Sequence, residues 1–320
     1  MPAEKHTTIF DAGKGYGPLT TLRTLVDCTV LKRQGRWWMV ICGVESTSHE
    51  IHLFSASLPE GAPLAAHGWT ITTDPTDPAR AALLAGKAQS YSWDGKGGRH
   101  CPSYVKGWDP QKNAWVERIY YAGAAQHFMG PYAIGHLEWD GVQWLDQPAP
   151  AFVANEPWEH GSVYEPNLVY HDGKWKMWYV AGANQDDYLV QGYSESADGR
   201  TGWSKHQIVF PPEEKVFDFC VLPVDGAYEA VFSRVNLRNA DLPKTGLWWC
   251  RADEPSPRIA DWTEPVRLSA PGPWKPVLRY GEIDPQRMFI FHDGVYPSAP
   301  GSVIPIHFTL DCLEIDRPKT

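Results

Sequence analysis

The sequence predicts an all-β protein folded as a five-bladed β-propeller, with about four antiparallel strands per blade around a central channel. Three observations predict this fold. Short aromatic and β-branched runs, bounded by Gly, Pro and Asp, fill most of the 320 residues. Long stretches with the 3.6-residue period of an amphipathic helix are nearly absent. An opening pattern recurs along the chain with an acidic residue at a fixed distance from a turn.

The repeat is clearest in residues 26–43, 164–182 and 217–235. In each stretch an acidic residue lies eight positions before a glycine and ten before an aromatic residue. The three sets are Asp27, Gly35 and Trp37; Glu165, Gly173 and Trp175; and Asp218, Gly226 and Tyr228. A β-sandwich would also contain many short strands, but it does not predict a repeated acid in one register.

Two further stretches, 100–124 and 274–294, fit the repeat with a longer turn. Aligning their prolines with Pro166 puts Cys101 and Lys275 where the other stretches carry an acid. The blades then open near residues 27, 101, 165, 218 and 275, separated by 74, 64, 53 and 57 residues. We expect a single propeller domain over residues 1–320.

Within a blade, the pattern predicts two strands joined by the turn, followed by one or two more. In the third blade these are 188–196 and 201–210, with a turn at Asp198-Gly199 between them. We expect residues 303–315 and the N-terminal stretch HTTIFDA to close the ring. The one fair helical candidate is DPARAALLAGKAQ, residues 77–89.

Composition limits the function classes. The formal net charge of −9, without blocks of like charge, argues against nucleic acid or an anionic membrane as the partner. The start of the chain lacks an apolar signal region, and no run of 18 apolar residues predicts a membrane span. Six scattered cysteines without a CxxC pair predict buried thiols in a reducing, cytoplasmic setting. We expect no cofactor and no metal; nothing indicates the oligomeric state.

The opening positions predict a shared site. The first residue of each innermost propeller strand points toward the axis, so Asp27, Glu165 and Asp218 should face one pocket with Lys275 beside them. Crowded, partly buried carboxyl groups raise one another's pKa, so that one acid stays protonated while another stays ionised. Glycosidic cleavage needs such a pair.

Three motifs carry a family resemblance: "EPNLV" and "KMWYVAG" in the third blade, and "ESADGRTGWS" after them. They resemble the five-bladed propeller glycosidases of glycoside hydrolase families 43, 32, 68, 62 and 130, most strongly over residues 160–205. The resemblance implies that Asp27 is the base or nucleophile and Glu165 the general acid. The chain departs from families 32 and 43 at blade two, where Cys101 replaces an Asp that stabilises the transition state or adjusts pKa. The opening "LVDCTV" also differs from the Asn-Asp-Pro-Asn-like opening of family 32.

The remaining candidate residues follow from these positions. Asp218 would supply the third catalytic carboxylate, or His100 would act as acid and base. Lys275 would contact an anionic or unusually hydroxylated substrate, or neutralise the acids. The candidate substrate-binding residues are His100, Cys101, Trp158, His160, Arg234, Trp274 and Lys275. Each acid could instead hydrogen-bond a neighbouring strand. The aromatic residues of the second strands, Trp37, Trp38, Trp175, Trp178 and Tyr179, are expected in the core.

Three functions remain open. The first is a glycoside hydrolase-like enzyme that cleaves a small glycoside or oligosaccharide with a Glu acid and an Asp base. The second is a lyase, isomerase or tailoring enzyme acting on a sugar-like metabolite, which the thiol and the lysine would suit. The third is a sugar-binding propeller without catalysis.

Overall fold

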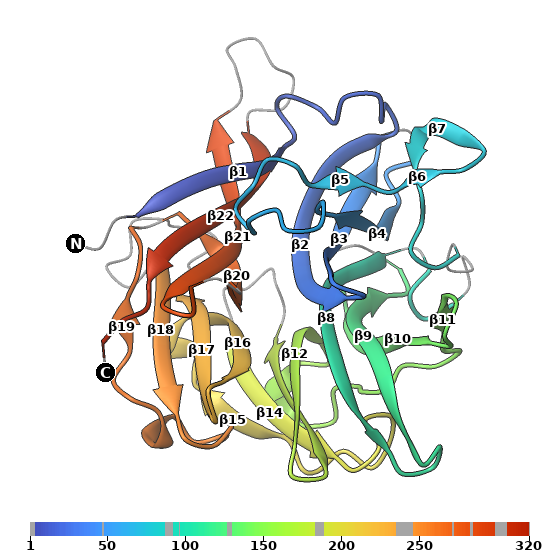
Figure 1. Ribbon diagram of the computed structural model, residues 1–320. Helices are drawn as coiled ribbons and strands as arrows, with labels where there is room; N and C mark the ends of the chain where they lie inside the picture. Colours follow the sequence, from blue (N-terminus) through green and yellow to red (C-terminus); the bar gives the residue numbers. More distant parts are fainter. Residues whose placement is uncertain are drawn as a thin grey trace.

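The computed structural model describes residues 4–46, 48–86, 92–95, 97–126, 130–182, 189–234, 246–270, 272–281, 284–297 and 306–319. Five antiparallel sheets of four strands each are arranged in a ring, which confirms the predicted five-bladed propeller (Figure 1). Helical structure in the described residues is confined to three single 3-10 turns, at Pro157–Glu159, Pro212–Glu214 and Ile259–Asp261. Among these residues, no helical segment combines the length and apolar character that crossing a bilayer requires.

The first four blades follow the chain in order, each from its innermost to its outermost strand. Blade one contains β2 (Leu22–Arg33), β3 (Arg36–Glu45), β4 (Ile51–Ser57) and β5 (Thr70–Ile71). Blade two contains β8 (Gly98–Asp109), β9 (Ala114–Ala124), β10 (Tyr132–Trp139) and β11 (Trp144–Asp146). Blade three contains β12 (Val163–His171), β13 (Lys174–Ala181), β14 (Val190–Ser196) and β15 (Gln207–Phe210). Blade four contains β16 (Val216–Val224), β17 (Ala227–Arg234), β18 (Gly246–Ala252) and β19 (Val266–Arg267).

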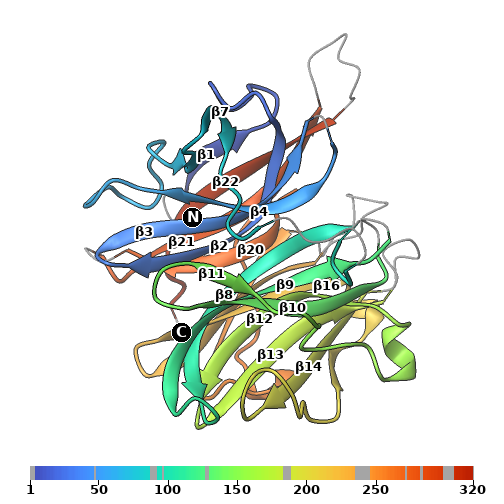
Figure 2. The same cartoon turned by 90° about the vertical axis from the view of Figure 1, so that its right-hand side faces the viewer.

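The fifth blade joins the two ends of the chain. Its inner strands are β20 (Trp274–Tyr280), β21 (Arg287–Pro297) and β22 (Ile306–Asp316), and its outermost strand is the N-terminal β1 (Lys5–Asp11). β1 runs antiparallel to β22, from Lys5 opposite Glu314 to Asp11 opposite Thr309. Figure 2 shows the same closure after a 90° turn. The N-terminal strand therefore closes the ring, as the sequence predicts.

The constant spacing of the repeat comes from identical hairpin turns. Gln34-Gly35, Asp172-Gly173 and Asp225-Gly226 all have positive φ at both positions, between 48° and 77°. This is the backbone of a two-residue type I′ turn, whose twist matches that of the flanking strands and whose second position favours glycine. Equal turns, reached after strand segments of equal length from each acid, fix the distance from the acid to its glycine.

Each blade-opening residue occupies a β-bulge in the left-handed region of backbone space. The φ angles of Asp27, Cys101, Glu165, Asp218 and Lys275 lie between 48° and 59°. The pairing of each innermost strand with its neighbour shifts register at the same point. A non-glycine residue with positive φ is uncommon, and bulges re-aim side chains. Five such bulges at one level turn five side chains toward the axis.

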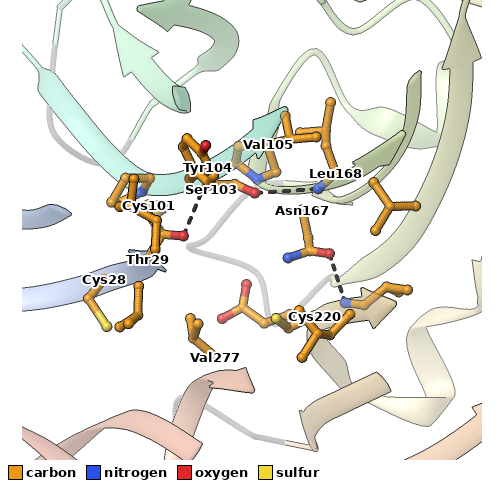
Figure 3. Close-up of a pocket in the computed structure, with 18 of the residues that line it drawn as sticks. Cys28, Thr29, Cys101, Ser103, Tyr104, Val105, Asn167, Leu168, Cys220 and Val277 are labelled. Carbon is orange, nitrogen blue, oxygen red and sulfur yellow. Dashed lines mark hydrogen bonds between the residues drawn. The ribbon is translucent and has the colours of Figure 1, made fainter. Parts of the chain in front are cut away.

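On the C-terminal side of these bulges, polar side chains join one blade to the next. Two positions after the opening residue, Thr29, Ser103 and Asn167 accept a hydrogen bond from a backbone N–H of the following blade (Figure 3). The shortest joins Val221 N to Asn167 Oδ1 at 2.8 Å. Val277 stands at this position in blade five. There, Arg279 Nε instead donates to Val30 O at 2.5 Å, so an arginine bridges blades five and one.

The helix predicted over residues 77–89 is wrong for the part that the structure describes, which ends at residue 86. Residues Asp77–Ala81 form strand β7, paired with β6 (Thr73–Asp74), and Leu83 bridges to Phe54 of β4. Leu84 N donates to Leu53 O at 2.8 Å. Hydrogen bonds to the edge of blade one therefore override a modest local preference for helix.

The aromatic side chains of the third blade pack in the core as predicted. Trp175, Trp178 and Tyr179 of β13 have no exposed surface. Trp37 and Trp38 of β3 are partly buried and pack against hydrophobic clusters on the two sides of blade one. All six cysteines are buried and free, as the sequence predicts.

Candidate active site

The ring of bulges brings four side chains together: the carboxyl groups of Asp27 and Glu165, the ammonium group of Lys275 and the thiol of Cys101. Lys275 Nζ lies 2.6 Å from Asp27 Oδ1 and 2.8 Å from Glu165 Oε1, so one ammonium group bridges both carboxyl groups. Cys101 Sγ lies 3.4 Å from Asp27 Oδ2 and 3.7 Å from Lys275 Nζ. The side chains of Asp27 and Glu165 are each only 6% exposed. Residues 248 positions apart in the sequence thus form one buried polar cluster.

The two carboxyl groups are close enough to act on one bond. Asp27, Cys101 and Glu165 each place one oxygen or sulfur atom within 4.8 Å of the others. Glycosidases that retain configuration hold their carboxyl groups about 5–5.5 Å apart, and those that invert it hold them about 6.5–9.5 Å apart to admit a water molecule. Asp27 and Glu165 are therefore near enough to serve as such a pair.

The surroundings move the pKa values of these two acids in opposite directions. Burial favours the neutral form of Asp27, but the Lys275 ammonium and the hydrogen bond to Asp293 outweigh it, and the pKa of Asp27 is lowered. Burial and the charge of Asp27 raise the pKa of Glu165, although Lys275 opposes them. Carboxylates outweigh the effect of burial on Lys275, whose pKa is raised. The cluster therefore favours an ionised Asp27 beside a Glu165 that holds its proton more tightly.

Two further carboxyl groups support this pair. Asp218 is hydrogen-bonded to Glu165, and burial together with the charge of Glu165 raises its pKa well above the ordinary value. Asp293, on β21, accepts the backbone N–H of Asp27 at 3.0 Å. Burial and the charge of Asp27 likewise raise the pKa of Asp293. Both groups favour the protonated form, so they support the ionised Asp27 without adding charge.

Two cavities meet at the ring. The N-side pocket, about 310 Å³, lies beside the N-terminal ends of the innermost strands. The C-side channel, about 300 Å³, follows the same strands beyond the ring toward their C-terminal ends (Figure 3). Asp27, Cys101, Glu165 and Lys275 line both cavities, whereas Asp218 lines only the C-side channel. The four shared residues thus form the floor that separates them.

The N-side pocket combines this charged floor with aromatic walls. The wall residues are Tyr132, Tyr164, Phe217, Trp274 and Phe308. Lys275 Nζ lies 5.1 Å from the centre of the Trp274 ring and 5.6 Å from that of Phe217. Tyr164 Oη and Trp274 Nε1 are buried without a hydrogen-bond partner in the described part of the chain. A pocket with apolar walls and a few convergent polar groups is the usual form of a small-molecule site.

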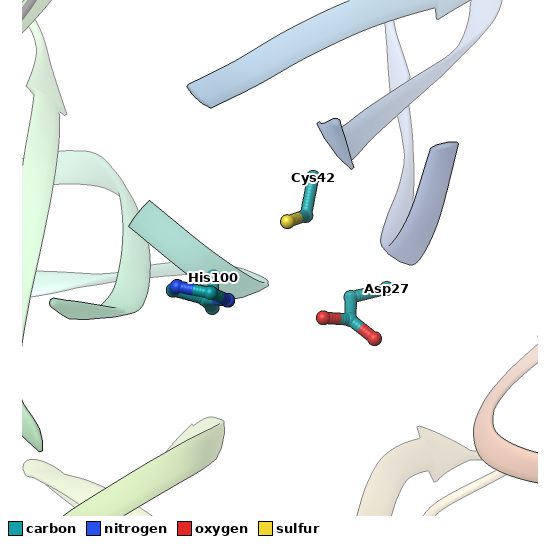
Figure 4. A group of neighbouring side chains, drawn as sticks. All are labelled: Asp27, Cys42 and His100. Atoms are coloured by element: carbon teal, nitrogen blue, oxygen red, sulfur yellow. The ribbon is translucent and has the colours of Figure 1, made fainter. Parts of the chain in front are cut away.

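His100 and Cys42 complete one wall beside Asp27 (Figure 4). One atom of each of these three side chains lies within 4.8 Å of the others, a spacing that could hold a metal ion. The Lys275 ammonium on the same Asp27 carboxylate opposes a cation there, and burial raises the pKa of the Cys42 thiol well above its ordinary value. His100 Nε2 instead contacts Gly97 O at 2.7 Å, and burial lowers its pKa. The group fits a neutral wall better than a metal centre.

The structure separates three predicted substrate-binding residues from these cavities. Trp158 stacks on Tyr179, with ring centres 6.3 Å apart, and packs against the core of blades two and three. His160 is exposed at the end of the Pro157–Glu159 turn. Arg234 Nη2 pairs with Glu214 Oε2 at 3.2 Å, and its guanidinium lies over the Trp248 ring. None of the three lines either cavity.

Sequence reasoning missed several residues that line the N-side pocket. Asp293 lies in stretch 274–294 of the repeat and pairs directly with Trp274, next to the blade-five bulge. Its position opposite the residue that precedes the predicted opening residue Lys275 is a signal that could have found it. Tyr164 and Phe217 each precede an opening residue, as Trp274 does, and could have been found in the same way. Tyr132 and Phe308 come from strands outside the repeat pattern.

Comparison with known proteins gives a match only at the level of structure. No protein-family model matches the chain, and no curated protein matches its sequence. The catalytic domain of a family 62 α-L-arabinofuranosidase from Coprinopsis cinerea superposes with a TM-score of 0.64 at 13% identity, over 98% of this chain and 97% of that one. The α-L-arabinofuranosidase from Podospora anserina, in complex with cellotriose, gives 0.62 at 15% identity, over 99% and 98%. A family 117 glycoside hydrolase from Zobellia galactanivorans gives 0.67 at 10% identity, over 99% and 91%.

The chain shares the five-bladed propeller fold of these glycoside hydrolases. At identities of 10–15% the likeness establishes the fold, which the superpositions cover almost end to end. Fold alone does not fix function, so the chemistry has to be argued from the residues of the ring.

Proposed function

We propose that the protein is a glycoside hydrolase-like enzyme that cleaves a glycosidic bond in the N-side pocket. The observation that carries this proposal is a pair of adjacent carboxyl groups with pKa values moved in opposite directions. Such a pair identifies which group holds a proton and which is ionised. Glu165 is the general acid that protonates the leaving oxygen. Asp27 is the carboxylate that attacks the sugar or activates water.

Lys275 takes over part of the task that a third carboxylate performs in the families that the sequence resembles. Its ammonium holds Asp27 ionised from 2.6 Å, while Cys101 adds no charge because burial raises the thiol pKa. Asp218, hydrogen-bonded to Glu165 from the channel side, adjusts the acid and does not touch the substrate. An entering sugar has to displace the Lys275 ammonium from Glu165, which frees the acid to reach the leaving oxygen.

The pocket supports a small substrate. A volume of about 310 Å³ holds one sugar ring and part of a second group, which favours removal of a terminal sugar. The Trp274 and Phe217 rings offer faces for the apolar side of a sugar. The unpartnered Tyr164 Oη and Trp274 Nε1 offer hydrogen bonds to its hydroxyl groups. A glycoside held between Asp27 and Glu165 is cleaved with retention if Asp27 acts as the nucleophile, and with inversion if Asp27 activates a water molecule.

A second candidate function is supported by the same ring. Cys101 stands where related propellers carry an acid, and Lys275 fills the gap between the two remaining acids. A site arranged in this way could bind a sugar without cleaving it, or transform a sugar-like metabolite without hydrolysis.

A panel of glycosides separates these functions. We expect the protein to release a single sugar from at least one member of a panel of aryl glycosides and unactivated oligosaccharides that includes α-L-arabinofuranosides and β-D-xylosides. Proton NMR of the first anomer formed distinguishes the two roles of Asp27. A product with the configuration of the substrate indicates a nucleophile, and a product of opposite configuration indicates a base. A sugar that binds in calorimetry but is never released would support the second candidate instead.

A further inference from the structure

The C-side channel carries a positive wall that the proposed reaction does not use. At the fifth position after each opening residue, blades one and two carry Lys32 and Lys106, and blades three and four carry Tyr170 and Pro223. In blade five, Arg279 stands at the fourth position after the opening residue, one residue nearer to the ring. All five residues line the channel. Cations from three consecutive blades therefore lie along one side of a channel in a protein whose formal net charge is −9.

Arg279 is a deeply placed cation without a carboxylate partner. Its Nε and Nη1 atoms donate to the backbone oxygens of Val30 and Leu278, each at 2.5 Å. Among the described residues it forms no ion pair, and burial lowers its pKa. A guanidinium presents donors in a planar fork that matches the oxygen atoms of carboxylate and phosphate. Its third nitrogen, Nη2, forms no hydrogen bond with the described residues and is available to a ligand in the channel.

Neighbouring groups add donors to the same space. Asn167 Oδ1 accepts the Val221 N–H, so the amide nitrogen of Asn167 is directed into the channel (Figure 3). An amide placed in this way donates and does not accept. Lys106 is exposed at the channel mouth and forms no ion pair with any residue that the structure describes. The acidic residues that line the channel are confined to the ring, where Lys275 pairs with Asp27 and Glu165.

We propose that the C-side channel is a binding site for a small oxyanion, the phosphate or carboxylate group of a ligand that enters from the face opposite the N-side pocket. Arg279 Nη2 and the Asn167 amide bind the oxyanion inside the channel. Lys106 draws the anion to the mouth, because a positive group beside a low-dielectric cavity concentrates anions there. The acidic residues of the ring lie at the inner end of the channel. The site is independent of glycoside cleavage, since Arg279, Asn167 and Lys106 do not line the N-side pocket.

Isothermal titration calorimetry of the full chain in a chloride-free buffer tests this site, with inorganic phosphate and acetate in separate titrations. We expect at least one of them to bind with a stoichiometry of one and with an affinity that falls as salt is added. The tighter of the two identifies the oxyanion class. Absence of binding by both anions to the folded wild-type protein would overturn the proposal.

Two variants locate the site. Arg279→Met should weaken binding at least tenfold, and thermal unfolding will show whether loss of the bond to Val30 also weakens closure of the ring. Because that loss could disturb the fold, Lys106→Gln serves as a second variant, expected to weaken binding severalfold with unchanged unfolding. Lys205→Gln, the same change at an exposed position that lines neither cavity, is the matched control. If Lys205→Gln weakens binding as much as Lys106→Gln does, the anion binds by general surface charge and the channel site is disproved.

Discussion

Glu165→Gln is expected to reduce kcat for an unactivated glycoside by about 10²–10⁴-fold, because the amide cannot protonate the leaving oxygen. Asp27→Asn should reduce it at least as much, because it removes the charge that attacks the sugar or activates water. Gln and Asn keep the shape of the side chains they replace, so both proteins should fold. Steady-state kinetics with a glycoside identified by the panel measures both effects.

The leaving group distinguishes the two roles. The leaving group of a 2,4-dinitrophenyl glycoside is 2,4-dinitrophenolate, which departs as an anion and needs no proton. Glu165→Gln should therefore lose much less activity on this substrate than on an unactivated one. Asp27→Asn should be equally impaired on both. The control is Glu195→Gln, which should retain wild-type rates. Glu195 is a partly exposed acid on β14 of blade three, and it pairs with Lys174 on β13. Equal losses for Glu165→Gln on both substrates would remove its role as general acid.

Lys275→Met is expected to move the whole pH profile of kcat/KM to higher pH. The ammonium lowers the pKa of Asp27, which must be ionised, and that group sets the acidic limb. It also lowers the pKa of Glu165, which must be protonated and sets the basic limb. Removing the positive charge therefore raises both pKa values, and both limbs shift in the same direction. Activity should therefore fall on the acidic side of the profile, where Asp27 becomes less ionised, and rise on the basic side, where Glu165 keeps its proton to higher pH.

The same substitution should lower the free energy of unfolding, by about 3–5 kcal/mol if the acids stay buried without their counter-charge. Denaturant unfolding measures this loss. Lys275→Arg keeps the charge and should restore the position of the pH profile even if its larger head reduces the rate. Lys174→Met, which removes a half-exposed lysine paired with Glu195, should leave the profile in place. A profile unchanged in Lys275→Met would show that the lysine does not set the pKa values of the pair.

The repeat made the fold predictable because one local geometry is used several times. A type I′ turn favours glycine at its second position, so Gly35, Gly173 and Gly226 mark the hairpins in the sequence. Counting back from each turn finds the bulge. The opening residues Asp27 and Glu165 could be placed at the axis for this reason, although nothing in their own sequence neighbourhood indicates a positive φ.

The partners of the acids were harder to predict because strand pairing supplies them. Lys275 was expected near the acids, but its contact with both at once depends on the depth of the blade-five bulge. Asp293 reaches Asp27 from a second strand, which the opening pattern does not cover. Trp158 and His160 were chosen for their closeness in sequence to Glu165. The loop that carries them instead packs Trp158 against Tyr179, away from the axis.

The most direct test of whether the ring moves the pKa values of two neighbouring acids in opposite directions is a carbon-13 NMR titration of the side-chain carboxyl groups. The signals of Asp27 and Glu165 are assigned with the variants Asp27→Asn and Glu165→Gln. We predict that Asp27 titrates below the ordinary range of an aspartate and Glu165 above that of a glutamate, with each titration altered when the other residue is replaced. Two independent titrations at ordinary values would contradict it, because the acids would then be solvated groups that do not share a site.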